Sequence, residues 1–126
     1  MRNIACVAII QNKKVLLTKE SGREIWTLPG GQIETGENSQ QTIGREIAEE
    51  LPDLKINDLK FYKKFCGHSP HQGDLISVDV YLATSNNKIE TAAEVDQAEW
   101  LAYGTNYNLS EITKNIIDDL HQNNFL

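Results

Sequence analysis

Residues 39–50, "SQQTIGREIAEE", restrict the fold of this chain more than any other segment, because apolar and acidic side chains recur there at helical spacing. At about 100° per residue, aliphatic side chains four residues apart share one stripe, which should face a core. They are Ile43, Ile47 and Leu51. An adjacent arc carries carboxylates three and four residues apart. They are Glu46, Glu49 and Glu50. The segment therefore predicts a helix that packs on one side and gathers acids at the edge of that side.

The residues on either side of this helix set its limits. Gly30 and Gly31 can let the backbone approach a ligand or adopt φ > 0, so their carbonyl groups could join a metal shell. Gly36 allows another tight turn before the helix. Pro52 cannot continue a helix and disfavours helical geometry at the preceding residue. We therefore expect the helix to end near Glu50.

The rest of the chain predicts strands that pair locally, with helices between them. Residues 4–10 and 15–19 are rich in β-branched and apolar side chains and predict a hairpin. Further strands are predicted at residues 25–28, 59–67, 75–84 and 98–102. Residues 108–120 fit an amphipathic helix that begins with a capping box of Asn108 and Glu111. Its inward side would be Ile112, Ile116 and Leu120. This order favours one α/β domain over residues 1–126, with a mixed sheet between helices on both faces.

Composition excludes several classes of function. The net charge of −6 opposes nonspecific binding to a nucleic acid polymer, which needs a basic surface. No apolar run approaches the ~20 residues of a membrane span. Cys6 and Cys66 form no disulfide framework, so we expect a cytoplasmic protein in which both cysteines pack in the core.

The acidic arc has two interpretations. Glutamates at helical spacing usually form a solvated face with basic partners, and such a structural domain would bind no nucleotide. Here Arg45 is the one basic residue nearby, and no lysine follows within a helical turn. Hard cations such as Mg²⁺ take oxygen ligands from a few carboxylates while keeping water and phosphate ligands. A cation site is therefore the second interpretation.

The segment "GGQIETGENSQQTIGREIAEE" resembles the box of the Nudix (MutT-like) hydrolase family: Gly, five residues, Glu, seven residues, Arg-Glu, an aliphatic residue, any residue, Glu-Glu. Seven positions are in register, namely Gly31, Glu37, Arg45, Glu46, Ile47, Glu49 and Glu50. One departure is Leu51-Pro52-Asp53-Leu54, where the family usually has a glycine and then an aliphatic residue. The resemblance implies an α/β/α sandwich with a mixed β-sheet between helices.

The resemblance also implies roles for individual residues. Mg²⁺, or Mn²⁺ in its place, would be bound by Gly30, Glu46, Glu49, Glu50 and an acid from a distant loop. That acid would be Glu94, six residues before Trp100, although a solvated loop acid is equally consistent and Glu90 and Glu99 are rivals. The catalytic group would comprise Glu46, Glu49, Arg45 and Glu37. Within it, Glu46 or a neighbour would take a proton from water, and Glu37 would pair with Arg45.

The reaction that the resemblance implies is hydrolysis of a diphosphate linkage in a nucleoside diphosphate joined to another group. A nucleoside triphosphate is the first candidate, and ADP-ribose or a nucleotide sugar is the alternative. The departure at Pro52 also allows a nucleotide-binding regulator without catalysis. Candidate substrate-binding residues are Trp26, Gly31 and His68, with core packing as the alternative for Trp26 and simple exposure for His68. A homodimer would fit the family as well.

Overall fold

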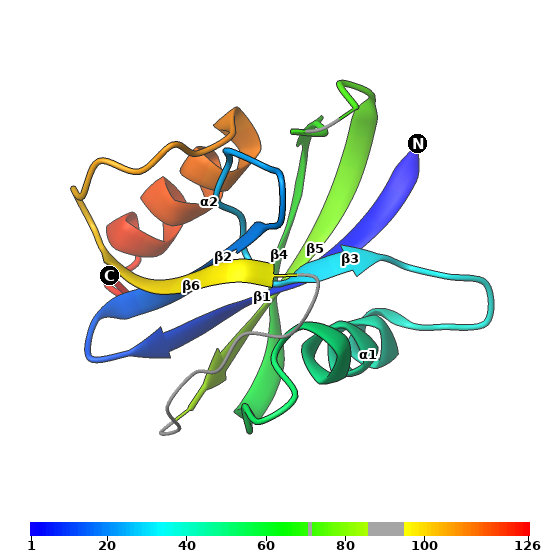
Figure 1. Ribbon diagram of the computed structural model, residues 1–126, viewed down its shortest axis with the longest axis horizontal. Coiled ribbons are helices and arrows are strands. Elements are labelled where there is room, and N and C mark those ends of the chain that lie inside the picture. The colour runs from blue at the N-terminus through cyan, green and yellow to red at the C-terminus, as the bar shows by residue number, and fades with distance from the viewer. Residues whose placement is uncertain (71, 86–94) are drawn as a thin grey trace.

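The computed structural model describes residues 1–70, 72–85 and 95–126 (Figure 1). The elements follow one another in the order β1 (Arg2–Gln11), β2 (Lys14–Glu20), β3 (Gly30–Gln32), α1 (Ser39–Glu50), β4 (Asn57–His68), β5 (Leu75–Thr84), β6 (Val95–Ala102) and α2 (Glu111–Gln122). In the described residues, neither helix has the length and apolar character that crossing a membrane requires.

The strands form one mixed sheet in the order β4-β5-β1-β2-β6, with β3 paired to β1 beside this path. β1 and β5 are parallel, and every other strand pair is antiparallel. The predicted hairpin is β1–β2, and its turn residues Asn12 and Lys13 both have positive φ, as a type I′ hairpin turn requires. The β1–β3 pairing draws residues 30–32 away from β2, so the sheet splits on that side.

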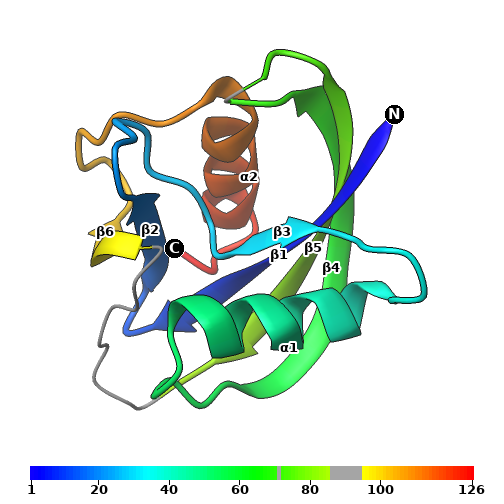
Figure 2. The same ribbon diagram turned by 45° about the vertical axis from the view of Figure 1, so that its right-hand side comes forward.

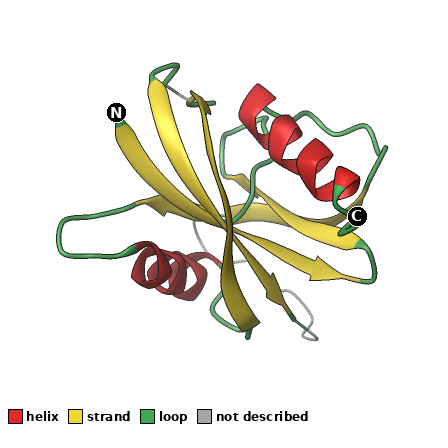
Figure 3. Ribbon diagram, turned by 180° about the vertical axis from the view of Figure 1, so that it is seen from behind, coloured by secondary structure: helices red, strands yellow, loops and turns green. Residues whose placement is uncertain are grey.

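The two helices cover opposite faces of the sheet (Figures 2 and 3). Alternating side chains along β1 go to different cores. Cys6 and Ala8 pack with α2, whereas Ala5, Val7 and Ile9 pack with α1. The predicted α/β/α arrangement with a mixed sheet is confirmed.

Helix α1 has the predicted bounds and the predicted packing. Ile43, Ile47 and Leu51 are all buried. Asn38 caps the first turn by accepting a hydrogen bond from the Gln41 backbone N–H, and the Gln41 side chain accepts from the Asn38 N–H in return. These two bonds fix where the helix leaves the preceding loop.

Three local predictions were wrong. Residues 25–28 form isolated bridges, and the strand lies at Gly30–Gln32, because β1 offers its backbone to that segment. The N-cap of α2 is Ser110, whose hydroxyl accepts from the Thr113 N–H, while the Asn108 side chain binds the Glu24 carbonyl group. Cys66 is exposed on the edge strand β4, and only Cys6 is in the core.

Candidate active site

Strand β3 holds the glycine pair in an unusual backbone position. The Val7 N–H donates to the Pro29 carbonyl oxygen at 3.0 Å, and the Ile33 N–H donates to the Asn3 carbonyl oxygen at 2.9 Å. In an antiparallel ladder, bonded and non-bonded pairs alternate. The Gly30–Cys6 pair is therefore a non-bonded one, which directs the Gly30 carbonyl group away from β1. This carbonyl oxygen therefore lies outside the β1–β3 ladder, where it could join the predicted metal shell.

Neither glycine of the pair has room for a side chain. Gly30 has φ of 154°, and a Cβ there would collide with the Ala5 carbonyl oxygen and with Cys6. A Cβ on Gly31 would instead collide with the Glu46 carboxylate. The acid from α1 therefore lies directly against the backbone of β3.

The Arg45 guanidinium joins this loop to the helix. Its Nε donates to Glu37 Oε2 at 2.7 Å, and its Nη2 donates to Glu37 Oε1 at 3.1 Å. Nη2 also donates to the Gln32 carbonyl oxygen at 3.1 Å, and Nη1 donates to Glu46 Oε1 at 2.9 Å. One planar group thus fixes β3, the loop and α1 relative to one another, and the predicted Glu37–Arg45 ion pair is present.

Glu37 is held in its ionised form by several donors. The Arg45 hydrogen bonds lower the pKa of Glu37 to about 2, and the Glu34 N–H contributes in the same direction. Thr42 also donates its hydroxyl proton to Glu37 Oε1 at 2.9 Å. In return, the Glu37 carboxylate raises the pKa of Arg45. The pair therefore stays charged through the whole physiological range.

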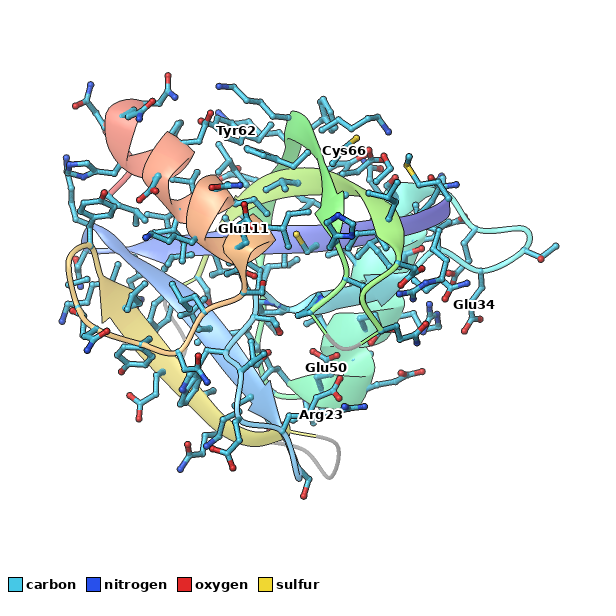
Figure 4. All side chains as sticks on the ribbon, turned by 90° about the horizontal axis from the view of Figure 1, so that it is seen from above. Arg23, Glu34, Glu50, Tyr62, Cys66 and Glu111 are labelled. Atoms are coloured by element: carbon cyan, nitrogen blue, oxygen red, sulfur yellow. The ribbon has the colours of Figure 1, made fainter. Side chains whose placement is uncertain are left out.

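The three acids of the arc lie in different environments. The Glu46 side chain is 14% exposed and the Glu49 side chain 48% exposed, whereas Glu50 is buried at the end of α1. Figure 4 shows Glu50 toward the middle of the molecule and Glu34 in the loop at its margin. Glu49 is therefore the most exposed of the three acids, Glu46 is largely covered and Glu50 is buried.

The chemistry of these groups suits a hard divalent cation, because the glutamate carboxylates and the Gly30 carbonyl group all offer oxygen ligands. The close contact between Glu46 and Gly31 brings these oxygens to the same backbone segment. Among the described residues, however, no three His, Cys, Asp or Glu side chains are arranged to hold a metal ion. Glu46 Oε1 is bonded to Arg45 instead.

A cleft of about 250 Å³ opens on the other side of the glycine pair, against α2. Its walls are mainly aliphatic, with Ile4, Cys6, Leu28, Ile76, Val78, Ile112 and Ile116. Gly30 and Gly31 form part of its lining, so β3 separates the cleft from the Glu46 carboxylate. A ligand with an apolar part in the cleft and a charged part at β3 would reach both regions.

The other predicted site residues lie elsewhere. Trp26 packs on Tyr107, with ring centroids 5.3 Å apart, and does not line the cleft. His68 is exposed, and its Nδ1 is 2.9 Å from the Gly73 carbonyl oxygen. Glu94 and its rival Glu90 lie outside the described residues, whereas the rival Glu99 is exposed on β6.

Sequence reasoning missed the charged residues at the rim of the cleft. Arg2 lines it and makes two hydrogen bonds to Asp74, at 2.8 and 2.9 Å. Glu20 lines it from the end of β2. Arg2 and Asp74 are 72 positions apart, so no local pattern could have paired them.

Comparisons with known proteins agree with this arrangement. A family model described as the NUDIX domain matches residues 1–120. The 8-oxo-dGTP diphosphatase of Buchnera aphidicola subsp. Schizaphis graminum (strain Sg) is 32% identical over 65 residues, covering 48% of this chain and 49% of that protein. A Bacillus subtilis (strain 168) protein named as a candidate ADP-ribose pyrophosphatase is 26% identical over 96 residues, covering 72% of this chain and 45% of that protein.

The matched regions thus span about half the length of these curated relatives. Among solved structures, the MutT NUDIX hydrolase from Burkholderia pseudomallei superimposes with a TM-score of 0.79 at 22% identity. The superposition covers 93% of this chain and 95% of that one, and it establishes a common fold.

Proposed function

The chain belongs to the NUDIX family, and on that premise we propose that it hydrolyses a diphosphate linkage in a nucleotide with the help of a divalent cation. One observation carries the proposal: the Arg45 guanidinium ties the Glu37 loop, the glycine strand and Glu46 into a single unit. That unit lies beside a cleft whose lining suits a nucleoside, because it is apolar inside and polar at the rim.

The residues that would hold Mg²⁺, or Mn²⁺, are Gly30, Glu46, Glu49, Glu50 and Glu94. The ion, when bound, neutralises phosphate charge and lowers the pKa of a coordinated water. Without it, the net charge of −6 and the acidic arc would repel a pyrophosphate. We therefore expect strict dependence of activity on a divalent cation.

Residues of the chain would hold the reacting groups in place and accept a proton from the attacking water. Arg45 orients Glu46 through the 2.9 Å hydrogen bond and keeps the loop against α1 through Glu37. Glu46 or Glu49 would accept the proton of the attacking water. Holding reacting groups in place contributes much of the rate in such chemistry.

A nucleoside triphosphate is the first substrate candidate. The cleft of about 250 Å³ lies below the usual range for drug-sized ligands, so it suits one nucleoside better than two linked ones. The Bacillus subtilis relative, which matches 72% of this chain, supports ADP-ribose as the second candidate. The substrate in either case is a small nucleotide, and no nucleic acid polymer is proposed.

We also propose that the protein is cytoplasmic and that it forms a homodimer. Cys6 and Cys66 are free thiols, which suits a reducing cytoplasm. The homodimer that the resemblance implies can be tested by sedimentation at several concentrations.

The test combines a substrate panel with two acid substitutions. The protein is incubated with Mg²⁺ and nucleoside triphosphates, ADP-ribose or nucleotide sugars, and release of pyrophosphate or monophosphate is measured. Glu49→Gln and Glu50→Gln should each lower turnover at least ~100-fold if they hold the metal. Glu24→Gln, an exposed acid of the β2–β3 connection, serves as the matched control and should retain full turnover.

Two results would refute the proposal. One is hydrolysis that persists unchanged when the divalent cations are chelated. The other is wild-type turnover in both acid variants, with folding verified by circular dichroism. Nucleotide binding without turnover of any substrate would favour the non-catalytic regulator.

A further inference from the structure

The described lining of the cleft contains one acid and one arginine, and they enter from different sides. Glu20 ends β2 and is paired with β6, at one margin of the sheet. Arg2 begins β1 and is bonded to Asp74, just before β5, toward the other margin. The N-terminus and the end of β2 lie well apart in both Figure 1 and Figure 2. The cleft therefore has the Glu20 carboxylate at one end and the Arg2–Asp74 ion pair at the other.

This arrangement orients a nucleotide. Phosphates are repelled by the Glu20 carboxylate, whereas the charge of the Arg2 guanidinium is balanced by Asp74, so the phosphates belong on the side of β3 and Arg2, away from Glu20. The base then extends along the aliphatic walls toward Leu28, Thr27 and Glu20. In this orientation the Glu20 carboxylate is the charged group that meets the edge of the base.

We propose, resting on the function proposed above, that Glu20 selects the base of the substrate by accepting hydrogen bonds from its N–H groups. An ionised carboxylate offers acceptors only. A guanine edge presents N1–H and the N2 amino group side by side, which matches the two carboxylate oxygens. A uracil edge presents one N–H between two carbonyl oxygens, which the carboxylate repels.

The local structure leaves Glu20 able to take this role. Its nearest ion-pair contact is Arg23 Nε at 3.9 Å, beyond hydrogen-bonding distance, and its side chain is 53% exposed. The β2–β6 ladder also shifts register between Lys19 and Glu20. By strict alternation Glu20 would share the face of Leu16, which packs with α1, yet it lines a cleft walled by α2. Such irregularities commonly re-aim a side chain.

The experiment measures kcat/KM for guanosine, adenosine, cytidine and uridine triphosphates in the wild type and in Glu20→Gln. Charge-assisted hydrogen bonds should give the wild type at least ~10-fold preference for guanosine over uridine triphosphate. Glu20→Gln, whose amide both donates and accepts, should reduce that preference at least ~5-fold. Glu24→Gln, an exposed acid of the β2–β3 connection, is the matched control and should keep the wild-type preference.

A second readout separates this inference from the proposed function. Calorimetry without metal measures binding of guanosine and uridine monophosphates, and the wild type should bind the first at least ~10-fold more tightly. If no nucleotide of the substrate panel is hydrolysed, the proposed function fails, and the monophosphate affinities still decide the role of Glu20. Equal affinities for the two monophosphates, or an unchanged preference in Glu20→Gln, would overturn the inference.

Discussion

Replacing each glycine of the β3 pair by alanine should separate stability from activity. At Gly30 the new Cβ would meet the Ala5 carbonyl oxygen and Cys6, both fixed in the ladder between β1 and β3. At Gly31 it would meet the carboxylate of Glu46, which is the far end of a rotatable side chain. The obstacle is rigid backbone in the first case and a movable group in the second.

The expected magnitudes follow from these obstacles. Gly30→Ala adds a strained φ to an unrelieved overlap, and each costs about 1–3 kcal/mol. The free energy of unfolding should therefore fall by about 2–6 kcal/mol, which lowers the Tm by roughly 10–25 °C. Gly31→Ala loses the Arg45–Glu46 hydrogen bond but gains from reduced entropy of the unfolded chain, and each effect is below ~1 kcal/mol. Its stability should stay within ~1 kcal/mol of wild type.

Gly31→Ala should lose activity although it keeps its stability. Displacing Glu46 from β3 in Gly31→Ala should lower Mg²⁺-dependent turnover by ~10- to 100-fold. Urea denaturation gives the free energy of unfolding, and pyrophosphate release at a temperature where both variants are folded gives the turnover. A Gly31→Ala protein with full turnover, or one as unstable as Gly30→Ala, would refute the reasoning.

Three further substitutions test the Arg45–Glu37 ion pair and the hydrophobic core. Arg45→Lys replaces a planar fork with one ammonium group and should cost about 1 kcal/mol in urea unfolding and at least ~10-fold in turnover. Glu37 has a folded pKa of about 2, below the unfolded value near 4.3, so its stabilisation is complete above about pH 5 and is lost as pH falls toward 2. Glu37→Gln should therefore flatten the decline of stability between pH 5 and 2, measured by unfolding at each pH. Ile47→Ala, in the core under α1, should cost about 2–4 kcal/mol of unfolding free energy.

Helix α1 could be predicted from the sequence because its signals are local. The aliphatic stripe fixes which side packs, and Pro52 fixes the end within one turn. The Glu37–Arg45 contact could be expected only through the family resemblance, since nothing in the local pattern specifies which charges meet. The positions of the acids followed from helical spacing, but their different exposure depends on the strands beneath the helix.

The cleft could not be predicted because it depends on contacts between distant segments. Residues 25–28 are more apolar than 30–32 and have the higher strand propensity, yet the glycine segment forms β3 because β1 has an open edge there. That pairing parts β3 from β2 and leaves space beside α2. Arg2 and Glu20 became candidate ligand contacts only through this separation.

The residues after α1 explain how the chain tolerates its departure from the family pattern. Leu51 leaves helical geometry with φ of −137° while its N–H still donates to the Ile47 carbonyl oxygen at 2.8 Å. The Leu54 N–H then donates to the Leu51 carbonyl oxygen at 3.0 Å, and both leucine side chains are buried with α1. The turn that contains Pro52 thus places a buried aliphatic side chain, Leu54, one position later than the aliphatic residue of the family pattern. Because both anchors hold the last turn against the sheet, Glu50 keeps a fixed, buried position at the helix C-terminus, where the helix dipole disfavours an anion and a bound cation would be stabilising.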